Sequence, residues 1–403
     1  MNQSLRRFVG ILAQRIVLAM MLVILLTACG VRQVTAQQRT FLNLSLEFLG
    51  EYHLPMMKFQ DTPVGGLSGI TYDRGRDRFY AISDDRSRLA PARFYTLKAV
   101  IKNPNNGKVG LQKVEVETVT FLTDPEGKTY PRDTIDAEGI ALSPQHSVFI
   151  SSEGVVSQGV PPFIREFDLQ TGRQQQSLPI PERYIPDQPK AKLQTRGIQN
   201  NLGFESLTLN PTGTIPAKGE PFRLFTATES ALVQDRDEPV AATSQAEVTE
   251  KGAKSRFLHY LLSDGPATVI SEHFYQLDPP PLGAVKHGLP EMLALDQGGH
   301  FLTLERSLGL LGFTAKIYQA ATGGATDTSR IASLKGQVTT AEPIQKQLLL
   351  DLSTLGISLD NLEGMTLGPR LADGTQSLLL VSDNNFATQQ ETQFLLFRLK
   401  SGR

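Results

Sequence analysis

A segment of about seventy residues recurs five times along this chain, and this repeat limits the possible folds more than any other feature. Each copy opens with a short apolar stretch that carries a polar, usually acidic, residue near its start. The five copies of this stretch are residues 66–72, 136–142, 203–209, 289–295 and 361–367. Their length, alternation and β-branched content predict a β-strand.

Three further strands are predicted in the repeat. The second ends on a carboxylate and covers residues 79–84, 148–153, 224–229, 301–305 and 379–383. The third covers residues 93–99, 163–169, 256–262, 315–320 and 393–399, and the fourth, in the first four copies, residues 114–122, 176–180, 268–277 and 345–352. Repeats of similar size with four antiparallel strands each are typical of propeller blades.

The last copy runs out of chain after its third strand, and residues 41–48 form a strand that belongs to no copy. We therefore predict an all-β fold, a β-propeller of five four-stranded blades whose ring is closed by this N-terminal strand joining the last blade. The long interval between Glu205 and Glu291 has room for a sixth blade, which stays an alternative to the count of five. Within it, residues 234–255 are polar and lack periodicity, which predicts a flexible insertion.

The first 28 residues have the order of a secretory signal peptide: arginines, then the apolar run 16–26, then small residues. Residues 26–29 (Leu-Thr-Ala-Cys) resemble the lipobox of bacterial lipoproteins, in which the cysteine is lipidated. The sequence thus predicts lipidation at Cys29, a linker over residues 29–40 and a propeller domain over residues 41–403. An uncleaved anchor that extends through Arg15 and a chance cysteine after an ordinary signal peptide remain alternatives.

Cys29 is the only cysteine, so the mature chain needs no disulfide in an oxidising compartment. No Asp follows it, which favours attachment to the outer membrane, with the protein facing the periplasm. The chain carries a formal net charge of −1, and loss of the three arginines in residues 1–28 leaves −4. This mild acidity argues against nucleic-acid binding. We expect a monomer that is attached to the membrane through Cys29.

The repeated carboxylates are expected to meet at one end of the propeller. One lies at the start of the first strand and one at the end of the second, and antiparallel neighbours bring these positions to the same end of a sheet. The set is Asp84, Glu138, Glu153, Glu205, Glu229, Glu291, Glu305, Glu363 and Asp383, with Ser68 in the tenth place. The third strands begin at this end with Arg93, Arg165, Arg256 and Lys316, and Arg86 and Arg306 follow second strands.

Two interpretations of this acidic face stay open. The carboxylates cap the backbone of the next blade or pair with arginine, or they bind a hard cation, because clustered oxygen ligands without cysteine suit Ca²⁺ or Mg²⁺. The candidate metal ligands are Asp84, Glu138, Glu153, Glu205, Glu229, Glu305, Glu363 and Asp383. The candidate catalytic residues are Glu138, Glu205 and Glu363, and the candidates for binding an anionic ester are Arg93, Arg165 and Arg306.

At these positions the sequence resembles the phytase-like family, which is described as having esterase-like activity. The resemblance rests on residues 66–70 (GLSGI), 80–85 (YAISDD), 136–140 (DAEGI), 203–207 (GFESL) and 361–365 (NLEGM), and it covers nearly all of the mature chain. It implies a relationship to calcium-dependent β-propeller phytases, in which acidic residues bind Ca²⁺ and the ions hold phosphate. The Lys- and Arg-rich phosphate contacts of those enzymes are not evident as a motif here.

Two functions fit this sequence. The first is a phytase-like or esterase-like hydrolase that acts on a small phosphoester or related anionic ester at the acidic face, with Ca²⁺ or Mg²⁺ as cofactor. The second is a non-catalytic propeller that binds a ligand or a protein on the cell envelope, since propellers serve both roles. The chain has no Gly-x-Ser-x-Gly elbow, and its six histidines show no metal-ligand spacing.

Overall fold

The computed structural model of the chain describes residues 40–102, 109–187, 194–211, 220–237, 252–336 and 338–402, together with residues 15, 17 and 20. The chain divides into two units, Met1–Thr40 and Phe41–Arg403. The predicted lipobox with Cys29 and the linker up to residue 39 lie outside the described residues. Within the described part, no helix has both the length and the apolar character that crossing a membrane requires.

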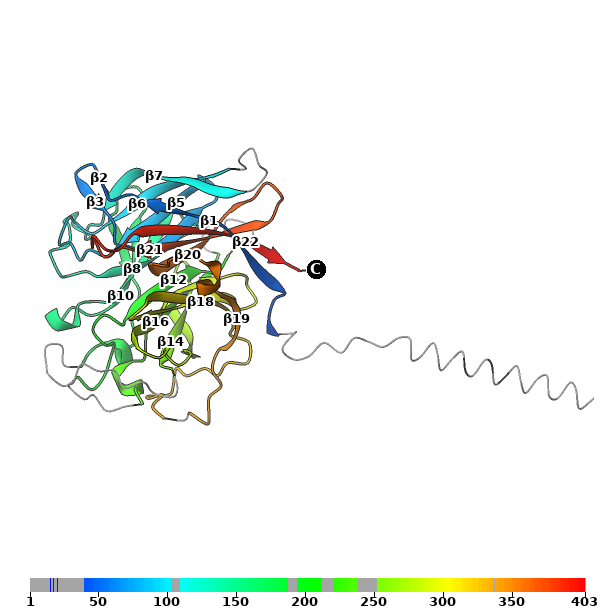
Figure 1. Cartoon of the computed structure of the whole chain (residues 1–403). Coiled ribbons are helices and arrows are strands. Elements are labelled where there is room, and N and C mark those ends of the chain that lie inside the picture. Colours follow the sequence, from blue (N-terminus) through cyan, green and yellow to red (C-terminus); the bar gives the residue numbers. More distant parts are fainter. Residues whose placement is uncertain are drawn as a thin grey trace, which may run out of the picture. The chain divides into compact units, whose positions relative to one another are not determined.

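The second unit contains five four-stranded antiparallel sheets, which we call blades 1 to 5 (Figure 1). Blade 1 has β4 (Leu67–Asp73), β5 (Arg78–Ser83), β6 (Arg93–Lys102) and β7 (Gly110–Phe121), and blade 2 has β8 (Ala137–Leu142), β9 (Ser147–Ser152), β10 (Phe163–Asp168) and β11 (Gln174–Ser177). Blade 3 has β12 (Phe204–Leu209), β13 (Phe222–Thr228), β14 (Lys254–Leu262) and β15 (Thr268–Gln276), and blade 4 has β16 (Ala284–Ala294), β17 (His300–Gly309), β18 (Gly312–Ala321) and β19 (Gln345–Asp351). Blade 5 has β20 (Asn361–Arg370), β21 (Gln376–Asp383), β22 (Thr392–Ser401) and β1 (Leu44–Leu54).

Short elements complete the domain. A two-stranded hairpin joins β2 (Met57–Phe59) to β3 (Thr62–Val64). The 3-10 helices are η1 (Val156–Gln158), η2 (Glu182–Tyr184), η3 (Val233–Asp235) and η4 (Leu352–Leu355). Each strand predicted from the repeat therefore has a counterpart, and the all-β propeller prediction is confirmed.

The ring is closed by both ends of the domain, as predicted. Strand β1 pairs antiparallel with β22, from Leu44 opposite Ser401 to Leu54 opposite Thr392. The strand begins later and runs further than the predicted residues 41–48. This pairing covers the edge of β22, which would otherwise expose its unpaired backbone groups.

The interval that left a sixth blade open contains the four strands of blade 3 and the start of β16, so the count of five holds for the described residues. Most of the predicted insertion, residues 234–255, lies outside the described residues. Its two ends are placed: the first belongs to η3 and the second begins β14.

The apolar core consists of five layers, each between the facing sides of two neighbouring blades. Strand β21 shows why. Its Leu379 and Val381 pack toward blade 1, whereas Leu378 and Leu380 pack toward blade 4. Successive side chains of a strand point to opposite faces, so a strand with both faces buried reads as a continuous apolar run.

Glycines beside the acidic positions allow the innermost strands to approach closely. A Cβ atom on Gly69 would lie 2.5 Å from the carbonyl oxygen of Glu138, and one on Gly139 would lie 2.6 Å from that of Glu205. The glycine that follows the acidic position of blade 2 is therefore a packing requirement between neighbouring blades.

We expect Gly139→Ala to lower the free energy of unfolding by about 1–3 kcal/mol, because the added methyl group must displace the backbone of blade 3. Urea denaturation followed by circular dichroism measures this change. Gly323→Ala is the matched control, since nothing lies within 4 Å of its added Cβ. Equal midpoints for the two variants would contradict the packing argument.

Candidate functional site: an acidic pocket on the propeller axis

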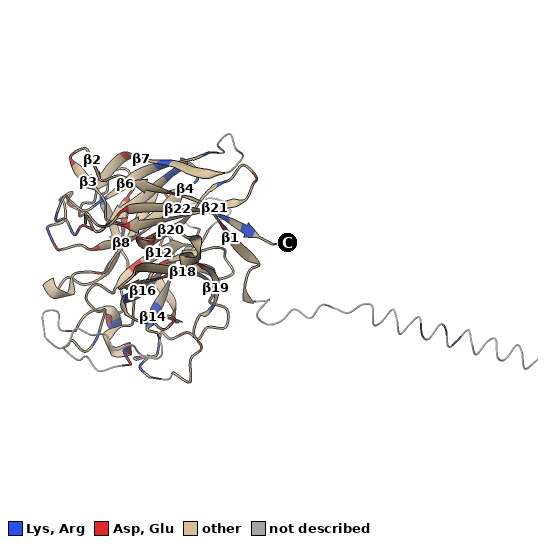
Figure 2. Cartoon of the chain, viewed as in Figure 1, with Lys and Arg blue, Asp and Glu red and all other residues tan. Residues whose placement is uncertain are grey.

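A pocket of about 1020 Å³ opens at the end of the propeller where the first strands begin and the second strands end. All five blades contribute to its wall. Eight of the residues predicted at this end line it: Asp84, Arg86, Glu138, Glu205, Glu229, Arg306, Glu363 and Asp383. Figure 2 shows acidic residues on the central strands around β8, β12 and β20. The antiparallel argument from the sequence thus placed most of the repeated carboxylates correctly.

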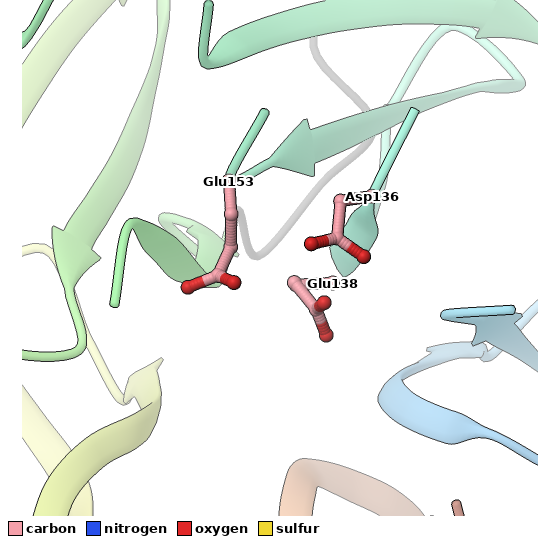
Figure 3. A group of neighbouring side chains, drawn as sticks. All are labelled: Asp136, Glu138 and Glu153. Carbon is pink, nitrogen blue, oxygen red and sulfur yellow. The ribbon is translucent and has the colours of Figure 1, made fainter. Parts of the chain in front are cut away.

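Two groups of three carboxylates stand out. One oxygen each from Asp136, Glu138 and Glu153 lie within 4.8 Å of one another, and the same holds for Glu153, Glu205 and Glu229. Figure 3 shows the three side chains of the first group as close neighbours. Glu153 belongs to both groups and accepts a hydrogen bond from the Gly203 amide. Asp136 was not among the predicted ligands, although it stands two residues before Glu138 in the second copy of the repeat.

Two guanidinium groups face these carboxylates. Arg306 Nη2 lies 2.6 Å from Glu229 Oε1, and its Nη1 lies 3.3 Å from Glu363 Oε1. Its Nε is buried and has no hydrogen-bond partner within the described residues. Arg86 Nε donates to Asp136 Oδ1 at 2.6 Å.

The acidic charge exceeds the basic charge at the centre of the pocket. Arg86 and Arg306 pair with members of a group of eight carboxylates: Asp84, Asp136, Glu138, Glu153, Glu205, Glu229, Glu363 and Asp383. Arg88, Arg132 and Lys286 also line the pocket, and both of these arginines pair with Asp133 instead. All eight carboxylates except Asp84 are buried. Buried like charges at this density must take up protons or bind cations.

The excess of acidic charge raises the pKa values of most of these carboxylates. Burial, and then the charges of Asp383 and Glu363, raise the pKa of Asp84 well above its usual range. Burial and neighbouring carboxylates likewise raise the pKa values of Glu138, Glu153 and Glu205. Burial raises the pKa of Asp136, with Arg86 opposing it. The same effects raise the pKa of Glu363 to about 8 and that of Asp383 to about 6. Without a cation, Glu363 therefore holds a proton at neutral pH.

The donor set fits a hard divalent cation. Both groups offer only carboxylate oxygens, which Ca²⁺ and Mg²⁺ prefer. A cation would neutralise carboxylates that the two arginines leave uncompensated. Asp136, Glu138 and Glu153 would hold one ion, and Glu153, Glu205 and Glu229 form the alternative or second position.

Three repeated glutamates lie outside the pocket wall: Glu153, which belongs to both carboxylate groups, and Glu291 and Glu305, which belong to neither. Glu291 Oε1 accepts a hydrogen bond from the Met292 amide at 2.8 Å, and its Oε2 accepts one from Met365 of blade 5 at 3.4 Å. Glu305 accepts from the Tyr275 hydroxyl at 2.8 Å and from the Asp278 amide at 3.0 Å. These contacts match the structural interpretation, in which a glutamate joins neighbouring segments.

Two of the three predicted arginines also lie away from the pocket wall. Arg93 is fully buried, pairs with Asp85 and donates to the Tyr95 hydroxyl at 2.6 Å. The Arg165 guanidinium lies 3.7 Å from the centre of the Phe163 ring. Both residues are engaged in blade packing, so among the three predicted arginines Arg306 is the one that faces the carboxylates.

Comparisons with known proteins agree with this description. A family model described as phytase-like, with the esterase-like activity of phytase, matches residues 62–386. No curated protein matches the chain. Similar solved structures include the calcium-binding protein regucalcin from Agrobacterium tumefaciens (13% identity, 85% of this chain and 94% of that chain, TM-score 0.36) and the catalytic domain of a GH62 α-L-arabinofuranosidase from Coprinopsis cinerea (11% identity, 89% and 98%, TM-score 0.40). The Dos1 propeller is another (8% identity, 83% and 68%, TM-score 0.32). These TM-scores are too low to carry an argument about function.

Proposed function

The chain belongs to the phytase-like family, and from that premise we propose that it hydrolyses a phosphoester or related anionic ester in the axial pocket with the help of a divalent cation, Ca²⁺ in the first place. One observation carries the proposal: two buried carboxylate groups that share Glu153 lie beside a pocket lined by arginines. We further propose that it acts outside the cytoplasm, because residues 1–29 have the pattern of a signal peptide and lipobox.

Different residues of the pocket are proposed to bind the anionic group and to transfer a proton. Arg306 and Arg86 line the pocket, where their guanidinium charges attract an anionic group. A bound divalent cation supplies Lewis-acid polarisation of the ester and lowers the pKa of a water molecule. Glu363 belongs to neither carboxylate group, and its pKa of about 8 leaves it protonated at neutral pH. It is therefore suited to give a proton to the leaving oxygen as a general acid.

The test is a panel of phosphate monoesters and carboxyl esters, assayed with excess Ca²⁺ and with excess EGTA. We expect hydrolysis of at least one ester class with Ca²⁺ and its loss in EGTA, restored by added Ca²⁺. Glu291→Gln is the matched control, because this carboxylate comes from the same repeat but belongs to neither carboxylate group and bonds to backbone amides. Hydrolysis that persists in EGTA would remove the cation from the mechanism.

The same panel separates the enzyme from a binding propeller. A protein that binds Ca²⁺ but hydrolyses no ester of either class is a ligand-binding propeller. That result would overturn the enzymatic proposal and leave the cation site in place.

A further inference from the structure

The wall of the axial pocket combines polar residues from all five blades with apolar side chains. The two carboxylate groups lie on blades 2 and 3, where Asn200 and Asn201 also line the pocket. Blades 4, 5 and 1, which are consecutive in the ring, add polar lining residues as well, among them Arg306, Glu363 and Asp84. The same three blades also supply apolar lining residues: Pro280, Ala284 and Val285 of blade 4, Phe386 of blade 5 and Leu89 of blade 1, which we call the apolar arc. The apolar lining residues of blades 2 and 3, Leu202 and Ala253, are partly covered.

Two residues of the apolar arc are strongly exposed to solvent. Leu89 is 56% exposed and Val285 is 65% exposed. Leu282 is 99% exposed in the segment that leads into β16, and the hairpin tip between β17 and β18 exposes Leu310 and Leu311. Ala284 pairs with Gly309, so this tip lies next to the start of β16. Exposed large apolar side chains gathered at a pocket are typical of a binding site.

Phe386 is held at the pocket rim by its local backbone. Its φ of 51° lies in the left-handed region, which is unfavourable for a bulky residue. Asn384 stabilises the turn, because its Oδ1 accepts hydrogen bonds from the Phe386 amide at 3.1 Å and from the Gly66 amide at 3.0 Å. A Cβ atom on Gly66 would lie 2.6 Å from the Phe386 ring, so glycine leaves the space that the ring occupies.

We infer that the ester taken by this pocket is amphiphilic: an anionic head group reaches the carboxylates and arginines, while an alkyl or acyl tail lies along the apolar arc. Hydrolysis of such an ester rests on the proposed function, whereas binding of an amphiphilic anion does not. A small, highly charged polyanion would gain nothing from Leu89, Val285 and Phe386. Lys286, the third residue of β16, places a cationic side chain next to Val285 in the pocket lining.

The experiment compares octyl phosphate, below its micelle concentration, with methyl phosphate. Their dissociation constants are measured by calorimetry on the full protein in excess Ca²⁺. Each methylene group that is half covered contributes roughly twofold to affinity, so the seven additional groups predict about 100-fold tighter binding of octyl phosphate. In the double variant Leu89→Ser/Val285→Ser we expect this ratio to fall below about tenfold.

Leu348→Ser is the matched control, because Leu348 is 49% exposed on β19 and does not line the pocket. It should keep the wild-type ratio. A wild-type ratio near one, or a ratio unchanged in the double variant, would overturn the inference. If the ratio is high but no ester is hydrolysed, the enzymatic proposal fails and the amphiphile site stands. If esters are hydrolysed without preference for longer tails, the inference alone fails.

Discussion

Glu153→Gln is expected to lower the calcium-dependent hydrolysis by roughly 100-fold and to remove most of the stabilisation that Ca²⁺ gives the protein. The reason is geometric, since Glu153 contributes an oxygen to both carboxylate groups and an amide lacks the charge that the cation needs. A ligand at 100 times its dissociation constant stabilises a folded protein by about 2.7 kcal/mol. Thermal unfolding with Ca²⁺ and with EGTA measures how much of this the variant retains.

Glu291→Gln again provides the comparison, because Glu291 is also buried but bonds to backbone amides away from the pocket. This control is expected to unfold at a lower temperature than wild type while keeping the full Ca²⁺ response. An equal Ca²⁺ response in Glu153→Gln and wild type would show that the repeated carboxylates serve packing alone.

Arg306→Met is expected to lower the free energy of unfolding by about 3–5 kcal/mol at pH 8 without Ca²⁺. Methionine approximates the length of the side chain but leaves the buried Glu229 and Glu363 without their cationic partner. The loss should shrink as the pH falls below about 8, because Glu363 has a pKa near 8 and takes up a proton there. Urea denaturation at pH 5 and pH 8 measures both values.

The control for this variant is Arg173→Met. Arg173 is exposed and donates to the Pro125 carbonyl oxygen at 2.8 Å. Its replacement should change stability by no more than about 0.5 kcal/mol at either pH. If Arg306→Met were as mild as this control, the two carboxylates would not depend on the guanidinium.

The fold and the acidic pocket follow from simple rules that the sequence displays. Strand alternation and antiparallel pairing place Glu138, Glu153, Glu205 and Glu229 at one end of their blades. The same rules predict the wrong position for Glu305. In blade 4, strand β17 continues to Gly309, so Glu305 pairs within the ladder opposite Lys316 instead of ending the strand. The next residue, Arg306, then faces the pocket.

The predicted arginines show a second limit of sequence reasoning. Arg93 begins the third strand of blade 1, and Arg165 is the third residue of the third strand of blade 2, so both lie near the expected end of the blade. A third strand lies two strands farther from the axis than the first, so its side chains do not reach the pocket. Arg93 instead donates to the Pro63 carbonyl oxygen, and Arg165 lies over the aromatic ring of Phe163. Distance from the axis depends on how the blades close into a ring, and a repeat alignment does not contain this information.

The most direct test of the cation site is the unfolding temperature measured from pH 5 to pH 8, once with EGTA and once with saturating Ca²⁺. The folded state raises the pKa values of Glu363 and Asp383 above those of the unfolded chain, so it binds more protons than the unfolded chain over this range. In EGTA, these groups therefore make stability fall as the pH rises. Cation binding requires deprotonated carboxylates, so the stabilisation by Ca²⁺ should grow with pH. We predict curves that diverge toward pH 8, and parallel or superimposed curves would contradict a divalent-cation site on the propeller axis.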